Sequence, residues 1–131
     1  MAMRAGVAKS EISTEDPSMI VHDPLFAKAL VLDDARTRVV ILAMDAVAIG
    51  GICDIGDEWL PELRARIESE LGIPGANVLV NASHTHTPGP MLVGHAEQLE
   101  RTLDAVRRAA EGLEEVAVGC GAGHEDRWII N

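Results

Sequence analysis

The stretch that most constrains the fold is a nearly continuous apolar run at residues 39–47, Val-Val-Ile-Leu-Ala-Met-Asp-Ala-Val. An apolar run of this length, rich in β-branched residues, is typical of a strand covered on both faces, so we expect a central strand of a sheet with helices flanking it. The run contains one charged residue, Asp45. Because an unpaired buried carboxylate is costly, we expect Asp45 to bond backbone amides or to support a site near the strand end.

The segments around this run predict an α/β fold. A polar turn at residues 33–37 joins two apolar runs into a β-hairpin, and apolar residues at steps of three and four predict two helices. The predicted elements, in chain order, are strands at 25–32 and 39–47, a helix capped by Asp57 and stopped by Gly72, a strand at 77–82, a helix from Ala96 to near Gly112, and a strand at 115–119. The order β-β-α-β-α-β favours a mixed sheet with helices packed on it, in a single domain spanning residues 1–131.

Composition and charge exclude several classes of partner. The chain has 21 acidic residues against 11 lysines and arginines, a net charge of −10, and only 2% aromatic residues. Such a surface repels phosphate backbones and anionic membranes and offers few rings for stacking on bases, so we expect no nucleic-acid partner. No apolar run is long enough to span a bilayer. We expect a cytoplasmic protein with two reduced cysteines, Cys53 and Cys120, although a single disulfide also fits the sequence.

The most informative motif is Asn-Ala-Ser-His-Thr-His-Thr-Pro-Gly-Pro at residues 81–90, at the end of a predicted strand. Ligands of α/β proteins usually bind at strand ends. In extended backbone His84 and His86 would project from one face, about 6 to 7 Å apart along the chain. Neutral imidazole binds zinc-type ions and exchanges protons near neutral pH. The motif predicts two metal ligands, or one ligand and one acid–base group; two histidines that are only solvated or hydrogen-bonded fit it as well.

Four segments, taken in order, resemble the N-terminal part of the neutral/alkaline non-lysosomal ceramidase family and its bacterial relatives. They are Ala-Gly-Val-Ala-Lys-Ser-Glu-Ile at 5–12, Val-His-Asp-Pro-Leu-Phe-Ala-Lys-Ala-Leu-Val-Leu at 21–32, Ala-Met-Asp at 43–45, and residues 77–90. The most specific piece, Ser-His-Thr-His-Thr-Pro-Gly-Pro at 83–90, looks like the family signature Thr-His-Thr-His-Ser-Gly-Pro, with Thr87-Pro88 in place of Ser-Gly.

This resemblance implies a Zn²⁺-dependent amidase that hydrolyses N-acyl linkages of a small-molecule or lipid-like substrate. Carried over by position, His84 would be a zinc ligand. His86 would line the site near the metal-bound water, as a second ligand or as the catalytic proton relay. His22, within a segment that the family also carries, would line the site or serve a structural role. Asp45 is expected to support the ligating groups or to line the site.

The chain by itself does not supply a complete zinc site. A catalytic zinc needs about three protein ligands, and the family's further ligands include a tyrosine, of which this chain has none. We therefore expect one of three cases: further sequence completes the site; a homo-oligomer completes it with His22, His95 or His124; or the chain is a non-catalytic structural domain that keeps the fold. A metal-dependent esterase or lactonase is a second alternative, because the same metal–water chemistry serves those carbonyls.

Overall fold

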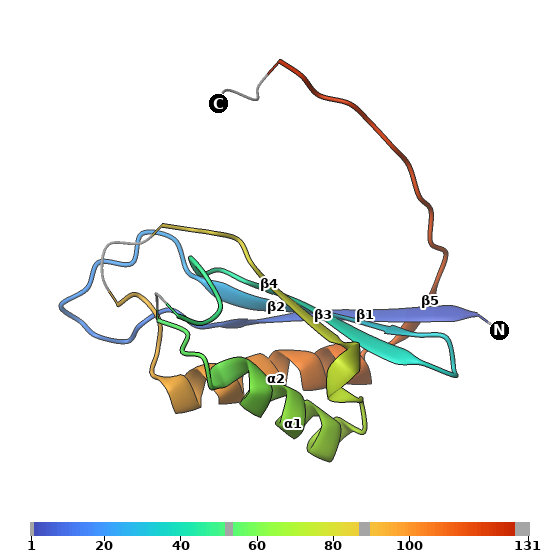
Figure 1. The fold of residues 1–131 in the computed structure, drawn as a ribbon, viewed down its shortest axis with the longest axis horizontal. Helices are drawn as coiled ribbons and strands as arrows, with labels where there is room; N and C mark the ends of the chain where they lie inside the picture. Colours follow the sequence, from blue (N-terminus) through green and yellow to red (C-terminus); the bar gives the residue numbers. More distant parts are fainter. Residues whose placement is uncertain (1, 52–53, 87–89, 128–131) are drawn as a thin grey trace.

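The protein is a two-layer α/β structure in which both helices cover one face of a five-stranded sheet (Figure 1). The computed structural model describes residues 2–51, 54–86 and 90–127. Across the sheet the strand order is β4-β3-β2-β1-β5. The elements are β1 (Met3–Glu11), β2 (Phe26–Asp33), β3 (Arg38–Met44), α1 (Trp59–Leu71), the short 3-10 helix η1 (Gly75–Asn77), β4 (Val78–Ala82), α2 (His95–Glu111) and β5 (Glu114–Val116). The expected α/β class with a mixed sheet is confirmed.

The predicted hairpin forms the middle of the sheet. β2 and β3 pair antiparallel in the register Leu30↔Ile41. Their turn is closed by Asp34, whose carboxylate accepts the backbone N–H groups of Arg36 and Thr37 at 2.9 and 2.7 Å. This is the usual way in which an aspartate stabilises a tight turn. β4 then pairs parallel to β3 after the chain has passed through α1, so the ends of β3 and β4 lie at the same edge of the sheet.

The observed order of elements along the chain has one strand more than predicted, and that strand is the first one. β1 pairs antiparallel with β2 from Arg4 to Glu11 and pairs with β5 at its other edge. Its sequence, Met-Arg-Ala-Gly-Val-Ala-Lys-Ser-Glu, is rich in small and charged residues that have little preference for strands. Pairing with β2 therefore decides the conformation of β1, and the order becomes β-β-β-α-β-α-β.

The helix ends agree with the prediction at one terminus and differ at the other. Gly72 ends α1 in the left-handed conformation (φ 66°), and its N–H reaches the carbonyl of Glu68. This is the usual glycine C-cap. At the other end, the expected cap by Asp57 is wrong: the N-cap is Glu58, and no side chain caps the helix there. α2 ends at Gly112, as predicted.

The core lies between the helices and the inner face of the sheet. Leu63 of α1 and Leu103 of α2 are fully buried against β-strand residues such as Val31 and Leu42. The opposite face of the sheet is not covered by either helix (Figure 1). The expectation that residues 39–47 are covered on both faces is therefore wrong in the described part of the chain, where Ile41 is only half-buried. None of the helices in the described residues is both long and apolar enough to cross a membrane.

β1 and α2 approach each other very closely at Gly6. A Cβ atom at this position would lie 1.9 Å from the carbonyl oxygen of Ala109 and 3.0 Å from its carbonyl carbon. Both obstacles are backbone atoms of α2, which cannot rotate away as a side chain could. The absence of a side chain at Gly6 therefore sets how closely the helix can sit on the sheet.

Candidate functional site

The residues singled out by the sequence gather at one end of the sheet. β3 and β4 both end there, β2 begins there, and the β1–β2 connection passes it. Asp45 directly follows β3, and His84 and His86 follow β4. Because neighbouring parallel strands end at the same edge, the topology brings these segments together although they lie about forty residues apart in the chain.

His84 is held in place by the loop that follows β3. Its Nδ1 lies 2.7 Å from the carbonyl oxygen of Val47. A carbonyl can only accept a hydrogen bond, so Nδ1 carries the proton and donates it. In the neutral imidazole the lone pair is then on Nε2, on the other side of the ring. This arrangement, with Nδ1 bonded to backbone and Nε2 free, is the one that metal-ligating histidines commonly adopt.

His86 lies directly against His84. The two ring centroids are 4.7 Å apart, and the ring planes are nearly perpendicular at 86°. The expected extended backbone is wrong here, because His84 has a positive φ of 61°. Few residues other than glycine adopt this conformation, so the turn is held by its contacts. These include the Val47 bond, a bond from the N–H of Ser83 to the carbonyl of Met44 (2.9 Å), and a bond between the hydroxyls of Ser83 and Thr85 (3.0 Å).

The chain beyond the histidines is anchored to the β1–β2 connection. The N–H of Thr14 donates to the carbonyl of Met91 at 2.7 Å, and the N–H of Val93 donates to the carbonyl of Ile12 at 3.0 Å. The carboxylate of Asp54 accepts the N–H of Met91 at 3.2 Å. Thr87, Pro88 and Gly89 of the motif lie outside the described residues. The two histidines therefore stand between a strand end and a segment that is bonded to another part of the fold.

Asp45 is engaged by the start of β2 and does not bond the histidines. Its carboxylate accepts the N–H of Phe26 at 3.1 Å and pairs with the Nζ of Lys28 at 2.8 Å. Its side chain is 14% exposed, so the lysine compensates a carboxylate that is largely removed from water. The sequence pattern did not identify Lys28 or Val47 as supports of this region, because both act through contacts between segments that are distant in the chain.

The other three histidines make no bond or ring contact with this pair among the described residues. His22 is exposed in the β1–β2 connection at the same end of the sheet. His95 begins α2 and pairs with Glu62 of α1, Nε2 to Oε2 at 3.0 Å. His124 is 85% exposed in the segment after β5. Among residues 2–51, 54–86 and 90–127, no hydrogen bond, ion pair or ring contact joins any of the three to His84 or His86.

The donor set fits a zinc-type metal only in part. His84 and His86 are both exposed and present neighbouring imidazoles, which suits one or two bonds to a transition metal. Within the described part of the chain, however, no group of three or more His, Cys, Asp or Glu side chains could hold a metal ion. Of the two cysteines, Cys120 is exposed after β5, and Cys53 lies outside the described residues. Residues 2–51, 54–86 and 90–127 thus offer two of the roughly three ligands that a catalytic zinc requires.

Comparison with solved structures gives the fold a context. A structure titled "Ceramidase complexed with C2" matches with a TM-score of 0.67 at 17% sequence identity, and the neutral ceramidase from Pseudomonas aeruginosa matches with a TM-score of 0.63 at 18% identity. Each match covers 88% of this chain and 22% of the other chain. The chain has the fold of part of a neutral ceramidase.

This likeness confirms at the level of the fold the resemblance found in the sequence. The chain spans about one fifth of the length of these ceramidases. No family model matches the sequence, and no curated protein matches it. At such low identity the structural likeness concerns the fold, so the chemistry must be argued from the residues themselves.

Proposed function

We propose that this chain is the metal-site part of a ceramidase-like hydrolase that cleaves amide (N-acyl) bonds with the help of a zinc-type ion. His84 would bind the metal through Nε2, and His86 would be a second ligand or the proton relay. The observation that carries the proposal is the bond from Nδ1 of His84 to the carbonyl of Val47, which leaves Nε2 as the unprotonated ring nitrogen. The ceramidase-like fold supports it.

The chemistry divides between the ion and the chain. A zinc-type ion, when bound, polarises the scissile carbonyl and lowers the pKa of a water molecule. The chain would hold His84 in one tautomer and one orientation, which avoids an entropic cost when the ligand bond forms. His86, with its ring 4.7 Å from that of His84, would take a proton at one ring nitrogen and return it to the leaving amine. Both imidazoles are exposed, so a substrate can approach them.

The site also requires ligands from elsewhere. Because a catalytic zinc needs about three protein ligands, we propose that the remainder comes from further sequence of the same protein or from a second copy of the chain. The chain covers only 22% of the ceramidases whose fold it shares, which supports the first source. The substrate we propose is a small-molecule or lipid-like N-acyl compound. A cytoplasmic location stays a prediction from composition.

NMR of the histidine side chains tests the proposal directly. Long-range ¹H–¹⁵N spectra of the metal-free protein should show His84 as the Nδ1–H tautomer, and Zn²⁺ addition should shift its Nε2 resonance. His84→Ala removes a proposed ligand, so it should weaken Zn²⁺ binding by at least about 10- to 100-fold, the loss typical when only a group supporting a ligand is removed. His124→Ala is the matched control, because His124 is exposed in the tail. Its Zn²⁺ affinity should equal that of the wild type if the further ligands come from additional sequence, and a loss would identify a second copy as their source. If Zn²⁺ addition leaves the His84 resonances of the wild type unchanged, the proposal that His84 binds the metal is refuted.

The main competing function is that of a non-catalytic structural or oligomeric domain. The observation that favours it is the incomplete donor set among the described residues. Hydrolysis assays of the Zn²⁺-loaded protein with matched N-acyl amide and ester substrates would separate the two functions and also test the esterase or lactonase alternative. If the wild type hydrolyses the amide and His86→Ala does not, the amidase function is supported. No turnover of either substrate in the longest natural chain would favour the structural domain.

A further inference from the structure

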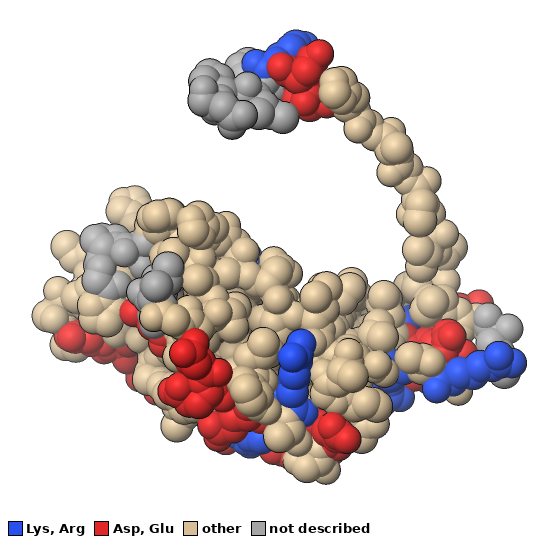
Figure 2. Space-filling model, viewed as in Figure 1, with Lys and Arg blue, Asp and Glu red and all other residues tan. Residues whose placement is uncertain are grey.

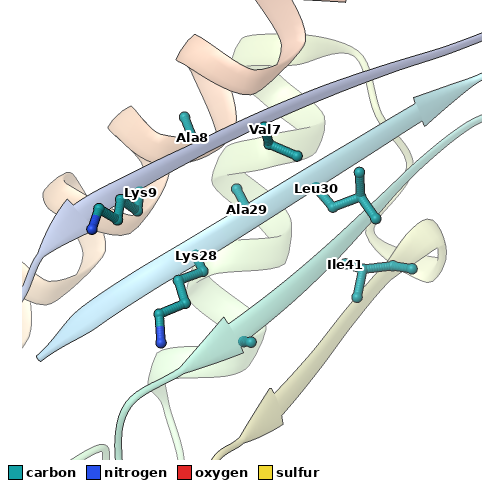
Figure 3. Close-up of a pocket in the computed structure, with 8 residues that line it drawn as sticks. Val7, Ala8, Lys9, Lys28, Ala29, Leu30 and Ile41 are labelled. Carbon is teal, nitrogen blue, oxygen red and sulfur yellow. The ribbon is translucent and has the colours of Figure 1, made fainter. Parts of the chain in front are cut away.

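The face of the sheet opposite the helices carries an unusual row of apolar side chains. The strand registers place Val7 opposite Leu30, Leu30 opposite Ile41, and Ile41 opposite Leu79. Figure 3 shows Val7, Leu30 and Ile41 side by side on adjacent strands. Val7 is 75% exposed and Leu79 is 60% exposed. We call Val7, Leu30, Ile41 and Leu79 the open-face row. Leu30 and Ile41, in the middle of the row, are half-buried. An apolar row with exposed ends of this kind usually marks a surface that something else covers.

The surroundings of the row are apolar on one side and basic on the other. The next register positions toward the β2–β3 turn are Ala5, Leu32 and Val39. In the other direction Lys9 lies opposite Lys28 (Figure 3). A hollow of about 400 Å³ lies on this face over β1, β2 and β3. It is lined by Val7, Lys9, Lys28, Leu30, Ile41 and neighbouring alanines.

The two lysines differ in how their charges are compensated. Lys28 is paired with Asp45. Lys9 lies over the ring of Phe26, 4.0 Å from its centroid, and has no carboxylate partner among the residues that the structure describes. In Figure 2 the acidic side chains gather mainly along the helical side, away from this face. The open face therefore presents an apolar row and one unneutralised cation.

The segment after β5 is placed to reach this face. Residues 117–127 are exposed and leave β5 on the side of the sheet opposite the helices (Figure 1). Eleven residues can span up to about 36 Å, whereas five strands are only about 19 Å across at the usual spacing. The segment leads to Trp-Ile-Ile at residues 128–130, which lie outside the described residues, and Glu125 and Asp126 come directly before them.

We propose that residues 128–130 of this chain, Trp-Ile-Ile, dock on the open-face row, with Asp126 directed toward Lys9. The apolar row matches an apolar segment. Glu125 is paired with Arg127 at 3.1 Å, so residues 125–127 keep a net negative charge, and the carboxylate of Asp126 matches the cation of Lys9. Docking within one chain is favoured because a tether of this length keeps the segment at a millimolar effective concentration near the face. The inference concerns the sheet face and does not depend on the metal site.

Tryptophan fluorescence tests this docking. Trp59 is fully buried in the core, so subtracting the signal of Trp128→Phe from that of the wild type isolates Trp128. Docking predicts a blue-shifted Trp128 that is shielded from acrylamide. Leu30→Glu puts a charge into the contact and should lower the docked-to-free ratio at least tenfold, which raises the quenching constant about threefold or more. Ile20→Glu is the matched control, because Ile20 is 87% exposed but lies outside the sheet, and it should leave quenching unchanged.

A second variant covers the case in which Leu30→Glu does not fold. Lys9→Glu reverses the charge proposed to face Asp126, and it should expose Trp128 at low salt and less so at high salt. A Trp128 that is fully accessible to acrylamide in the wild type overturns the proposal. Shielding that rises with protein concentration, together with a dimer in light scattering, also overturns it, because the occupant would then be a second copy. Shielding that appears only on adding another protein overturns it in favour of a foreign partner.

Discussion

Replacing Gly6 with alanine should destabilise the protein by forcing α2 away from the sheet. The added Cβ would lie 1.9 Å from the carbonyl oxygen of Ala109, whereas real Cβ atoms essentially never come within 3.0 Å of another heavy atom. The helix and β1 must therefore separate locally by about 1.1 Å, the difference of those two distances. The neighbouring Gly112 carbonyl carbon, at 3.1 Å, blocks a sideways shift.

The cost follows from the contacts that this separation loosens. α2 buries seven residues against the sheet and α1, and a gap of about 0.5–1 Å forfeits about a quarter to a half of the attraction between contacting atoms. Overpacking in a dense core typically costs about 1–3 kcal/mol, and here the obstacle is rigid backbone. We expect a loss of about 3–4 kcal/mol, a large share of the roughly 5–15 kcal/mol that a domain has.

Urea unfolding followed by far-UV circular dichroism measures this loss in Gly6→Ala. The matched control is Gly94→Ala on the same helix, where the added Cβ meets no atom within 4 Å, and the change should stay below about 1 kcal/mol. If the free energy of unfolding of Gly6→Ala lies within about 0.5 kcal/mol of the wild-type value, the helix does not sit on β1 as closely as the structure indicates, and the reasoning fails.

Two further predictions concern charge and packing. The hydrogen bond from Arg38, with the N–H of Ala35 and the charge of Arg4, holds the pKa of Asp33 below its ordinary 3.8. This stabilisation is complete above pH 3.8 and is lost as the pH falls through the lower folded-state pKa. Urea unfolding at several pH values should thus show that the free energy of unfolding falls less steeply with acid in Asp33→Asn than in the wild type. Equal slopes of free energy against pH would contradict the assignment. Leu103 of α2 is fully buried in the core, so Leu103→Ala should lower the free energy of unfolding by about 2–5 kcal/mol. A change below about 1 kcal/mol would show that this position is not part of the core.

Several parts of the fold could be predicted because they depend on local pattern. The turn at 33–37, the helical spacing before Gly72 and the apolar run before His84 each define an element through residues that are neighbours in the chain. β1 could not be predicted in the same way. Its small and charged residues have weak strand preference, and it becomes a strand because β2 on one edge and β5 on the other bond its backbone.

The candidate site shows the same division. The spacing of His84 and His86 indicated two neighbouring imidazoles, and the structure places their rings 4.7 Å apart. The sequence did not show that the carbonyl of Val47 selects the tautomer of His84, or that Lys28 neutralises Asp45. Those contacts join the loop after β3 to the loop after β4 and to the start of β2. They exist only because the sheet places these strand ends together.

By itself the sequence determined the α/β class, most element boundaries and the pair of histidines. The physical reason is that the periods of strands and helices, glycine stops and turn residues act over a few neighbouring positions. Tertiary structure alone decided that Gly6 is a point of backbone contact, that the Val47 carbonyl fixes the tautomer of His84, and that one face of the sheet stays open along Val7, Leu30, Ile41 and Leu79. Each of these depends on which distant segments meet, and residue spacing does not encode that.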